Sequence, residues 1–149
     1  TLTIMKDSHI GTYGVIGLII YFLMMTQLAC LSVSMLCTLF FCGDCWGKFC
    51  ASQLINFLPY ARKEEESKAK VVYHRMNGYE RIFNLAGGLL PAILLLPATL
   101  WLGFVGSILI LAFLVRLMKR RLQGYTGDCC GATFLLCELA FYLCTIILV

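Results

Sequence analysis

Residues 119–128 read KRRLQGYTGD, and they separate two apolar segments of this chain. The three cations end the first segment, where Lys and Arg complement a helix dipole and also suit phosphate or lipid headgroups. Gly124 and Gly127, with Gly131 beyond them, would let backbone N–H groups come close to a ligand. Asp128 would either cap the following helix or hold a divalent cation. A juxtamembrane basic anchor and a phosphate site both fit this stretch.

The rest of the chain is strongly apolar. Apolar residues make up 60% of its 149 residues and charged residues 13%, and its mean hydropathy is +0.86. A soluble domain is about half apolar and about a quarter charged. We therefore predict an all-α fold, a polytopic transmembrane helical bundle in contact with the lipid bilayer. The net charge of +4 is modest, and we expect no nucleic-acid partner.

Apolar runs and their breaks predict about five membrane-crossing helices in a single transmembrane domain, residues 1–149. The runs are long enough, or nearly so, to cross a bilayer with some tilt. Cys42–Cys45 is interpreted as a turn, and Pro97 as the break in the uncharged run 82–115. The predicted helices are 15–41, 46–60, 82–97, 100–118 and 129–149. Because the sequence opens at Thr1 in a polar stretch, we expect an N-terminal part of a longer protein to precede it.

Five crossings would place three polar segments on one face, namely 1–14, 61–81 and 119–128. This face would hold, or border at the membrane edge, every Lys and Arg except Lys48. The excess of positive charge predicts that the face is cytoplasmic. A surface rich in acidic, basic and glycine residues at the mouth of a bundle favours a phosphorylated ligand.

Glu138 is a carboxylate inside the last predicted span. Such a group costs about 2.5–3.5 kcal/mol at the centre of a spanning helix, so it should face a partner or a wet cavity. Glu138 follows Asp128 by ten residues, which is about 15 Å along a helix and too far for both to bind one metal ion. A hydrogen bond to a neighbouring helix is the structural alternative to a role in a cavity.

Three pieces of the sequence resemble one family of membrane enzymes, the cobalamin-5′-phosphate synthases, also called adenosylcobinamide-GDP ribazoletransferases. The pieces are IMKDSHIGTYG (4–14), PYAR (59–62) and GYTGDCCGA (124–132) followed by Glu138. Their order, their spacing and the apolar spans between them fit over essentially the whole chain. In this family Gln123 would stand at the first position of a usual Gly-Gly pair. The family's aspartate-rich segment, thought to bind magnesium, has no counterpart in these residues, so we expect no activity from them alone.

The resemblance implies a transferase in a bacterial or archaeal plasma membrane, with its motif loops in the cytoplasm. It would join α-ribazole, or α-ribazole 5′-phosphate, to adenosylcobinamide-GDP and release GMP, with Mg²⁺ as cofactor. By resemblance, Asp7 and Asp128 are the candidate catalytic and metal-binding residues. The candidate substrate-binding and phosphate-binding residues are Lys6, Ser8, Gly11, Gly14, Arg62, Arg121, Gly124, Thr126, Gly127 and Glu138.

Two other classes of protein remain open. The first is a non-catalytic polytopic membrane protein, a transporter or assembly subunit, whose basic loops only set its topology. It would bind no guanine nucleotide conjugate and need no metal ion. The second is a lipid-headgroup phosphotransferase, whose own aspartate signature is not visible in the sequence. The sequence also leaves open whether the protein forms an oligomer.

Overall fold

The computed structural model describes residues 11–61 and 74–147 of the chain. These residues form five α-helices and two short 3₁₀ helices, with no strand among them, and the all-α prediction is confirmed. The elements are α2 Thr12–Thr26, η1 Gln27–Cys30, α3 Val33–Phe57, α4 Gly78–Leu95, η3 Ala98–Trp101, α5 Leu102–Arg121 and α6 Gly127–Ile146.

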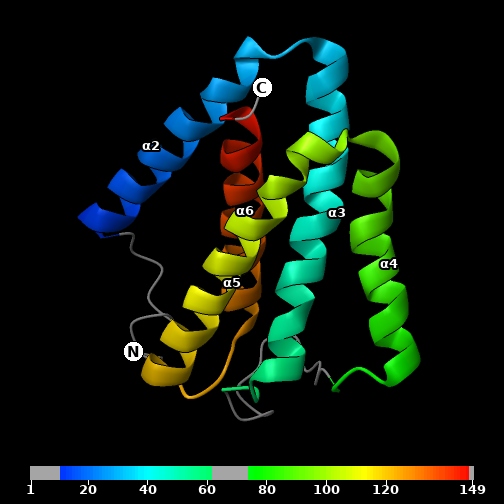
Figure 1. The fold of residues 1–149 in the computed structure, drawn as a ribbon. Coiled ribbons are helices and arrows are strands. Elements are labelled where there is room, and N and C mark those ends of the chain that lie inside the picture. Colours follow the sequence, from blue (N-terminus) through cyan, green and yellow to red (C-terminus); the bar gives the residue numbers. More distant parts are fainter. Residues whose placement is uncertain (1–10, 62–73, 148–149) are drawn as a thin grey trace.

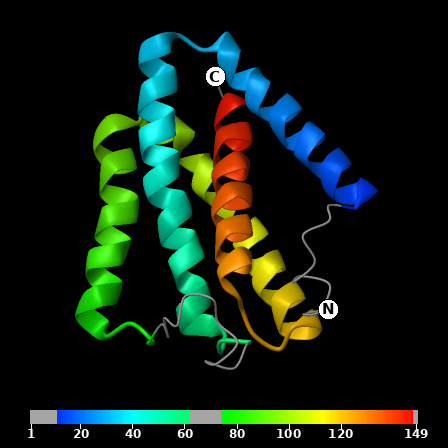
Figure 2. The ribbon, with the colours of Figure 1, turned by 180° about the vertical axis from the view of Figure 1, so that it is seen from behind.

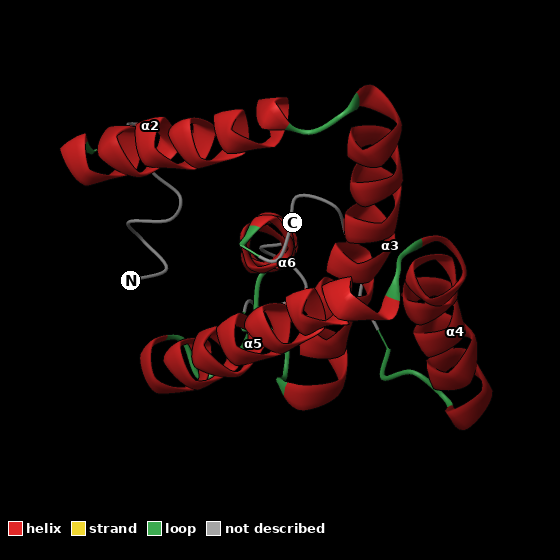
Figure 3. Cartoon of the chain, turned by 45° about the horizontal axis from the view of Figure 1, so that its top comes forward, coloured by secondary structure: helices red, strands yellow, loops and turns green. Residues whose placement is uncertain are grey.

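Helices α3, α4, α5 and α6 run alternately down and up the molecule, and α2 leans across one side (Figures 1 and 2). Helix α6 packs against both α3 and α5, whereas α4 packs against α3. Figure 3 looks nearly along α6 and shows α2, α3 and α5 around it. The ends of α3 and α5 and the start of α6 therefore meet at one end of the bundle, where the candidate site lies.

The prediction of one helix over 15–41 was wrong. Helix α2 ends at Thr26, η1 follows, and α3 begins only at Val33. Ser32 is the N-cap of α3, and its hydroxyl accepts a hydrogen bond from the backbone N–H of Met35 at 3.4 Å. A serine at this position satisfies a backbone donor that the first turn leaves without a partner, and it favours the start of a new helix. An uncharged run gives no sign of such a break.

The predicted turn at 42–45 was also wrong, and with it the start of a separate helix at residue 46. Helix α3 runs through this segment without interruption to Phe57. A Cβ on Gly43 would collide with the ring of Tyr142, and one on Gly47 would lie 2.9 Å from the ring of Phe134. The two glycines, four residues apart, therefore form the surface on which α6 approaches α3, as small residues do between membrane helices.

Fewer helices than the predicted five have the length and composition of a membrane span. Among the described residues there are three: Thr12–Cys30, Ala98–Arg121 and Gly127–Ile146. Helix α3 carries an ion pair between Lys48 Nζ and Asp44 Oδ2 at 2.7 Å, and the first turns of α4 carry Glu80 and Arg81. These polar residues lower the hydropathy of α3 and α4.

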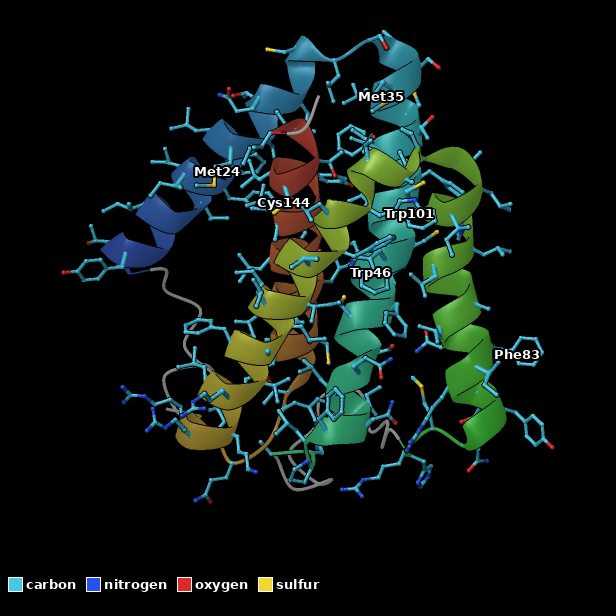
Figure 4. All side chains as sticks on the ribbon, viewed as in Figure 1. Met24, Met35, Trp46, Phe83, Trp101 and Cys144 are labelled. Atoms are coloured by element: carbon cyan, nitrogen blue, oxygen red, sulfur yellow. The ribbon has the colours of Figure 1, made fainter. Side chains whose placement is uncertain are left out.

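Small residues also allow close packing of α5 on α6. A Cβ on Gly103 would lie 2.7 Å from Thr145 Oγ1, so that glycine is in direct contact with the neighbouring helix. The buried hydroxyl of Ser107 donates to the carbonyl of Cys137 at 2.7 Å, one turn further along. Trp46 fills the space between α3 and α5, with its ring centroid 4.6 Å from that of Phe104 (Figure 4). The helices that carry the candidate site are thus held together along their length.

Candidate functional site

The α5–α6 turn, defined here as residues 119–128, begins with three cations in the last turn of α5. Lys119, Arg120 and Arg121 are all exposed, and Figure 4 shows nitrogen atoms gathered at this end of α5. Cations at a helix C-terminus interact favourably with the dipole, and this position also leaves them available to an anion. Gln123 ends the helix with a φ of 56°, the only positive φ of a non-glycine residue in the described part of the chain.

The turn is bonded to the segment that follows α3. The backbone N–H of Tyr125 donates to the carbonyl of Pro59 at 2.9 Å, and the N–H of Ala61 donates to the carbonyl of Tyr125 at 2.8 Å. These bonds form a short parallel bridge between Tyr60 and Tyr125, whose rings meet edge to face at 5.4 Å. The structure thus brings together the second and third of the three sequence pieces.

Gly124 makes this bridge possible. A Cβ on Gly124 would lie 2.5 Å from the carbonyl oxygen of Pro59 and 3.0 Å from Cα of Ala61. Only a residue without a side chain fits against backbone at that distance. Gly124 is buried, so the structure gives it a packing role, and its expected contact with a phosphate remains a prediction.

Thr126 is the N-cap of α6 and has no exposed surface. Its hydroxyl accepts from the N–H of Cys129 at 3.4 Å and lies 3.2 Å from Cys129 Sγ, to which it can donate. A capping threonine of this kind stabilises a helix by about 1 kcal/mol. Thr126 therefore positions the turn, and its predicted contact with substrate is not tested by this geometry.

Gly127 and Asp128 form the first exposed residues of α6. No atom lies within 4 Å of the position that a Cβ on Gly127 would take. The carboxylate of Asp128 is in the first turn, where a negative charge is stabilised by the helix dipole. An exposed carboxylate next to open backbone, one short turn away from Arg121, can bind a metal ion or orient a hydroxyl group.

Glu138 lies inside the bundle, and only 8% of its surface is exposed. The hydroxyl of Tyr142, one turn further along α6, donates to Glu138 Oε1 at 2.5 Å. The Tyr142 ring packs over Gly43 of α3, and its hydroxyl also lies 3.4 Å from the carbonyl of Phe40. The predicted partner on a neighbouring helix is thus replaced by a tyrosine of the same helix, which α3 holds in place.

The first sequence piece is only partly described. Lys6, Asp7 and Ser8 lie outside the described residues, as does Arg62, which directly follows the bridge. Gly11 is the N-cap of α2 and Gly14 is in its first turn; both are exposed. Figures 1 and 3 place this start of α2 apart from the α5–α6 turn. Of the predicted site residues, the described structure gathers Arg121, Gly124, Thr126, Gly127 and Asp128.

A polar network that sequence reasoning missed links α3 and α4 at the same end of the bundle. Asn84 Nδ2 donates to Ser52 Oγ at 2.5 Å, and the backbone N–H of Met76 donates to Asn56 Oδ1 at 3.2 Å. In the sequence, Asn56 only interrupts an apolar run. Polar residues at one-turn spacing, such as Ser52 and Asn56, are the signal that could have revealed a hydrogen-bonded face.

The described residues contain no group of three or more His, Cys, Asp or Glu side chains placed to hold a metal ion. Asp128 is the one acidic residue of the α5–α6 turn, and Mg²⁺ needs several oxygen ligands, of which some are usually water or phosphate oxygens. The described part of the site would thus supply one Mg²⁺ ligand and does not form a complete metal site.

The family model for cobalamin-5-phosphate synthase matches residues 1–146. Two relatives named adenosylcobinamide-GDP ribazoletransferase, from Shewanella woodyi and Leptothrix cholodnii, are 35% and 36% identical over 95% of this chain and 57% of each relative. A third, from Shewanella halifaxensis, is 31% identical over 99% of this chain and 58% of its own length. No solved structure matches the chain.

The match leaves part of each relative uncovered, since the chain spans about 57% of their length. Within the chain, however, the matched region includes the bridge between Tyr60 and Tyr125 and the whole α5–α6 turn. The chain therefore belongs to the cobalamin-5-phosphate synthase family.

Proposed function

We propose that the protein takes part in joining α-ribazole, or α-ribazole 5′-phosphate, to adenosylcobinamide-GDP. The products are GMP and adenosylcobalamin, or adenosylcobalamin 5′-phosphate. The observation that carries this proposal is the bridge between Tyr60 and Tyr125. It joins the segment that ends at Ala61 to the turn that bears Arg121 and Asp128. Family membership supports a transferase over the non-catalytic transporter or assembly subunit.

The proposed reaction transfers the cobinamide phosphoryl group from GMP, a phosphate leaving group, to an alcohol. The ribazole hydroxyl attacks the phosphorus next to cobinamide, a new P–O bond forms, and the P–O bond to the GMP leaving group breaks. The hydroxyl proton passes to a base, and the negative charge of the leaving phosphate grows. Positioning and electrostatic stabilisation supply most of the catalysis in such transfers.

The residues of this chain would divide those tasks. Arg121 and Arg62, with Lys6, would bind phosphate oxygens, because guanidinium and ammonium groups suit that geometry. Asp128, with Asp7, would orient the attacking hydroxyl or accept its proton. The open backbone at Gly127 and Gly11 would admit phosphate to N–H groups. Gly14 would line the site, because its own N–H donates to the carbonyl of Gly11.

Mg²⁺ would neutralise the charge of the diphosphate when it is bound. Asp128 is the described candidate ligand, and Asp7 is a further candidate from the sequence. The described residues form no complete metal site, so the proposed steps are those of the protein's own side chains. Ser8, Gly124 and Thr126 would shape the site, and Glu138 would line its inner part about 15 Å from Asp128 along α6.

Three helices among the described residues are long and apolar enough to cross a membrane, which supports a membrane protein. We further propose that this membrane is the plasma membrane and that the α5–α6 turn faces the cytoplasm. The concentration of Lys and Arg at that end of the bundle supports this orientation. This orientation in the membrane is compatible with an oligomer.

A loop-closure assay tests the proposed function. Membranes containing this chain are incubated with adenosylcobinamide-GDP, α-ribazole and Mg²⁺, and cobalamin and GMP are measured. A second sample uses this chain joined to the part of the Shewanella woodyi relative that it does not cover. We expect product at least from the joined protein. A membrane-inserted, folded joined protein that forms no product would favour the non-catalytic alternative.

A further inference from the structure

An open apolar groove runs along the outer side of α5. Its volume is about 690 Å³, and residues on α5 and the last residue of α3 line it. Phe57 of α3 forms one wall, and Ile108, Leu111 and Ala112 form part of the other, with Arg116 and Lys119 at one end. Ala112 has the smallest side chain of these residues and is exposed, which leaves room at the middle of the groove.

The α5 side of the groove is one continuous face of the helix. Ile108, Leu111, Val115 and Lys119 line the groove and follow one another at the spacing of three and four residues that places side chains in one row. From Ile108 to Lys119 the helix rises about 16 Å. Half of the hydrocarbon thickness of a bilayer is about 15 Å. The groove thus has the length of an acyl chain in one leaflet.

The charges lie where a phospholipid would have its phosphate. Arg116 and Lys119 are exposed, and none of the described residues that line the groove is acidic. Their cationic groups lie at the end of α5, whereas the apolar lining continues toward the middle of the bundle. This order of cations and then apolar surface matches the order of phosphate and acyl chain in an anionic lipid.

The walls of the groove do not suit a small soluble anion. Phe57 and Phe113 are each 61% exposed, and the span that contains α5 has a mean hydropathy of 2.4 with 22% of it buried. Surface of this kind is stable in contact with lipid and not with water. The occupant should therefore be a molecule of the bilayer itself.

We propose that this groove binds one anionic phospholipid, with an acyl chain along α5 and its phosphate held by Arg116 and Lys119. The proposal does not depend on the transferase reaction. The site would retain phosphatidylglycerol in preference to phosphatidylcholine, because the quaternary ammonium of the second lipid brings a positive charge to the two cations.

Native mass spectrometry of the detergent-solubilised protein tests the proposal. The protein is titrated with phosphatidylglycerol and, separately, with phosphatidylcholine, and the affinity for the first lipid bound is measured. The wild type should bind phosphatidylglycerol more tightly. Each of Arg116→Ala and Lys119→Ala should weaken that binding by about fivefold, since a cation near an anionic lipid surface contributes about 1 kcal/mol. The control Arg75→Ala removes an exposed cation outside the groove and should not weaken it.

A second pair of variants tests the acyl-chain part without changing charge. Ala112→Phe fills the groove and should abolish the preference for phosphatidylglycerol. Leu109→Phe places the same ring on an exposed position of α5 that does not line the groove, and it should bind lipid like the wild type. Equal affinity for the two lipids in the wild type would overturn the proposal. So would unchanged binding in Ala112→Phe, or displacement of the lipid by inorganic phosphate or GMP.

Discussion

Tyr125 donates its backbone N–H to the carbonyl of Pro59 at 2.9 Å, and this bond joins the α5–α6 turn to the end of α3. The two residues are far apart in the sequence, and both lie within the region that the cobalamin-5-phosphate synthase family model matches. Because the bond is between backbone groups, the register of the two segments is fixed independently of any ligand.

Replacing Gly124 should separate the two segments. In Gly124→Ala the new methyl group would lie 2.5 Å from the Pro59 carbonyl oxygen, and overpacking of this kind costs about 1–3 kcal/mol. We expect a lower melting temperature and a loss of transferase activity. Gly131→Ala is the control, because no atom lies within 4 Å of its Cβ position in α6, and alanine favours a helix by about 0.5–1 kcal/mol. Equal melting temperatures for the two variants would contradict the close contact between Gly124 and the Pro59 carbonyl.

The packing of α6 on α3 depends on Gly43. Its Cβ would collide with the Tyr142 ring, so Gly43→Ala should lower the free energy of unfolding by about 1–3 kcal/mol. Gly87→Ala in α4 serves as the matched change, since the space around Gly87 is open. Thermal unfolding in detergent compares them. A Gly43→Ala protein that is as stable as Gly87→Ala would contradict the close contact between Gly43 and the Tyr142 ring.

Tyr142 should stabilise the protein through Glu138. In Tyr142→Phe the ring remains, but the buried carboxylate loses the donor at 2.5 Å, and a buried polar group left without its partner costs about 1–3 kcal/mol. Tyr79 is 82% exposed, so Tyr79→Phe should have no effect on the melting temperature. If the two tyrosine variants unfold at the same temperature, the hydrogen bond makes no net contribution.

Gln123 adopts a backbone conformation that glycine tolerates better. Its φ is 56°, and the left-handed region costs about 1–2 kcal/mol for a residue with a Cβ, which is partly offset by the greater freedom of glycine in the unfolded chain. Gln123→Gly should therefore be as stable as the wild type or slightly more so. Gln123→Val should be less stable than either, because a β-branched residue is strained there. The reverse order in limited proteolysis of the turn would exclude this conformation.

The sequence was sufficient for the all-α class and for helices apolar enough to cross a membrane. Predicted helices 82–97, 100–118 and 129–149 overlap α4, α5 and α6, because charges and Pro97 mark their limits. The run 15–41 carries no such marks, and its break depends on a single capping serine. Gly43 was interpreted as a turn residue, since a glycine that permits close helix packing has the same appearance in a sequence.

The site shows a similar limit. Motif spacing predicts Gly124 and Thr126 as site residues, but it cannot separate residues that position the turn from residues that contact substrate. Thr126 caps α6 through its own first turn, whereas Gly124 contacts backbone of residues more than sixty positions earlier in the chain. No local pattern predicts that contact.

The most direct test of the account is the transferase activity of Asp128→Asn. The joined protein described above is assayed for cobalamin and GMP, with the melting temperature as the check on folding and Asp44→Asn, an exposed carboxylate of α3, as the matched control. We predict that Asp128→Asn folds normally and loses activity by about a hundredfold or more, as expected when a group that orients a nucleophile or accepts its proton is removed. Asp44→Asn should stay within about twofold of the wild type, because an exposed ion pair contributes little. Full activity of a folded Asp128→Asn would contradict a catalytic site at the α5–α6 turn.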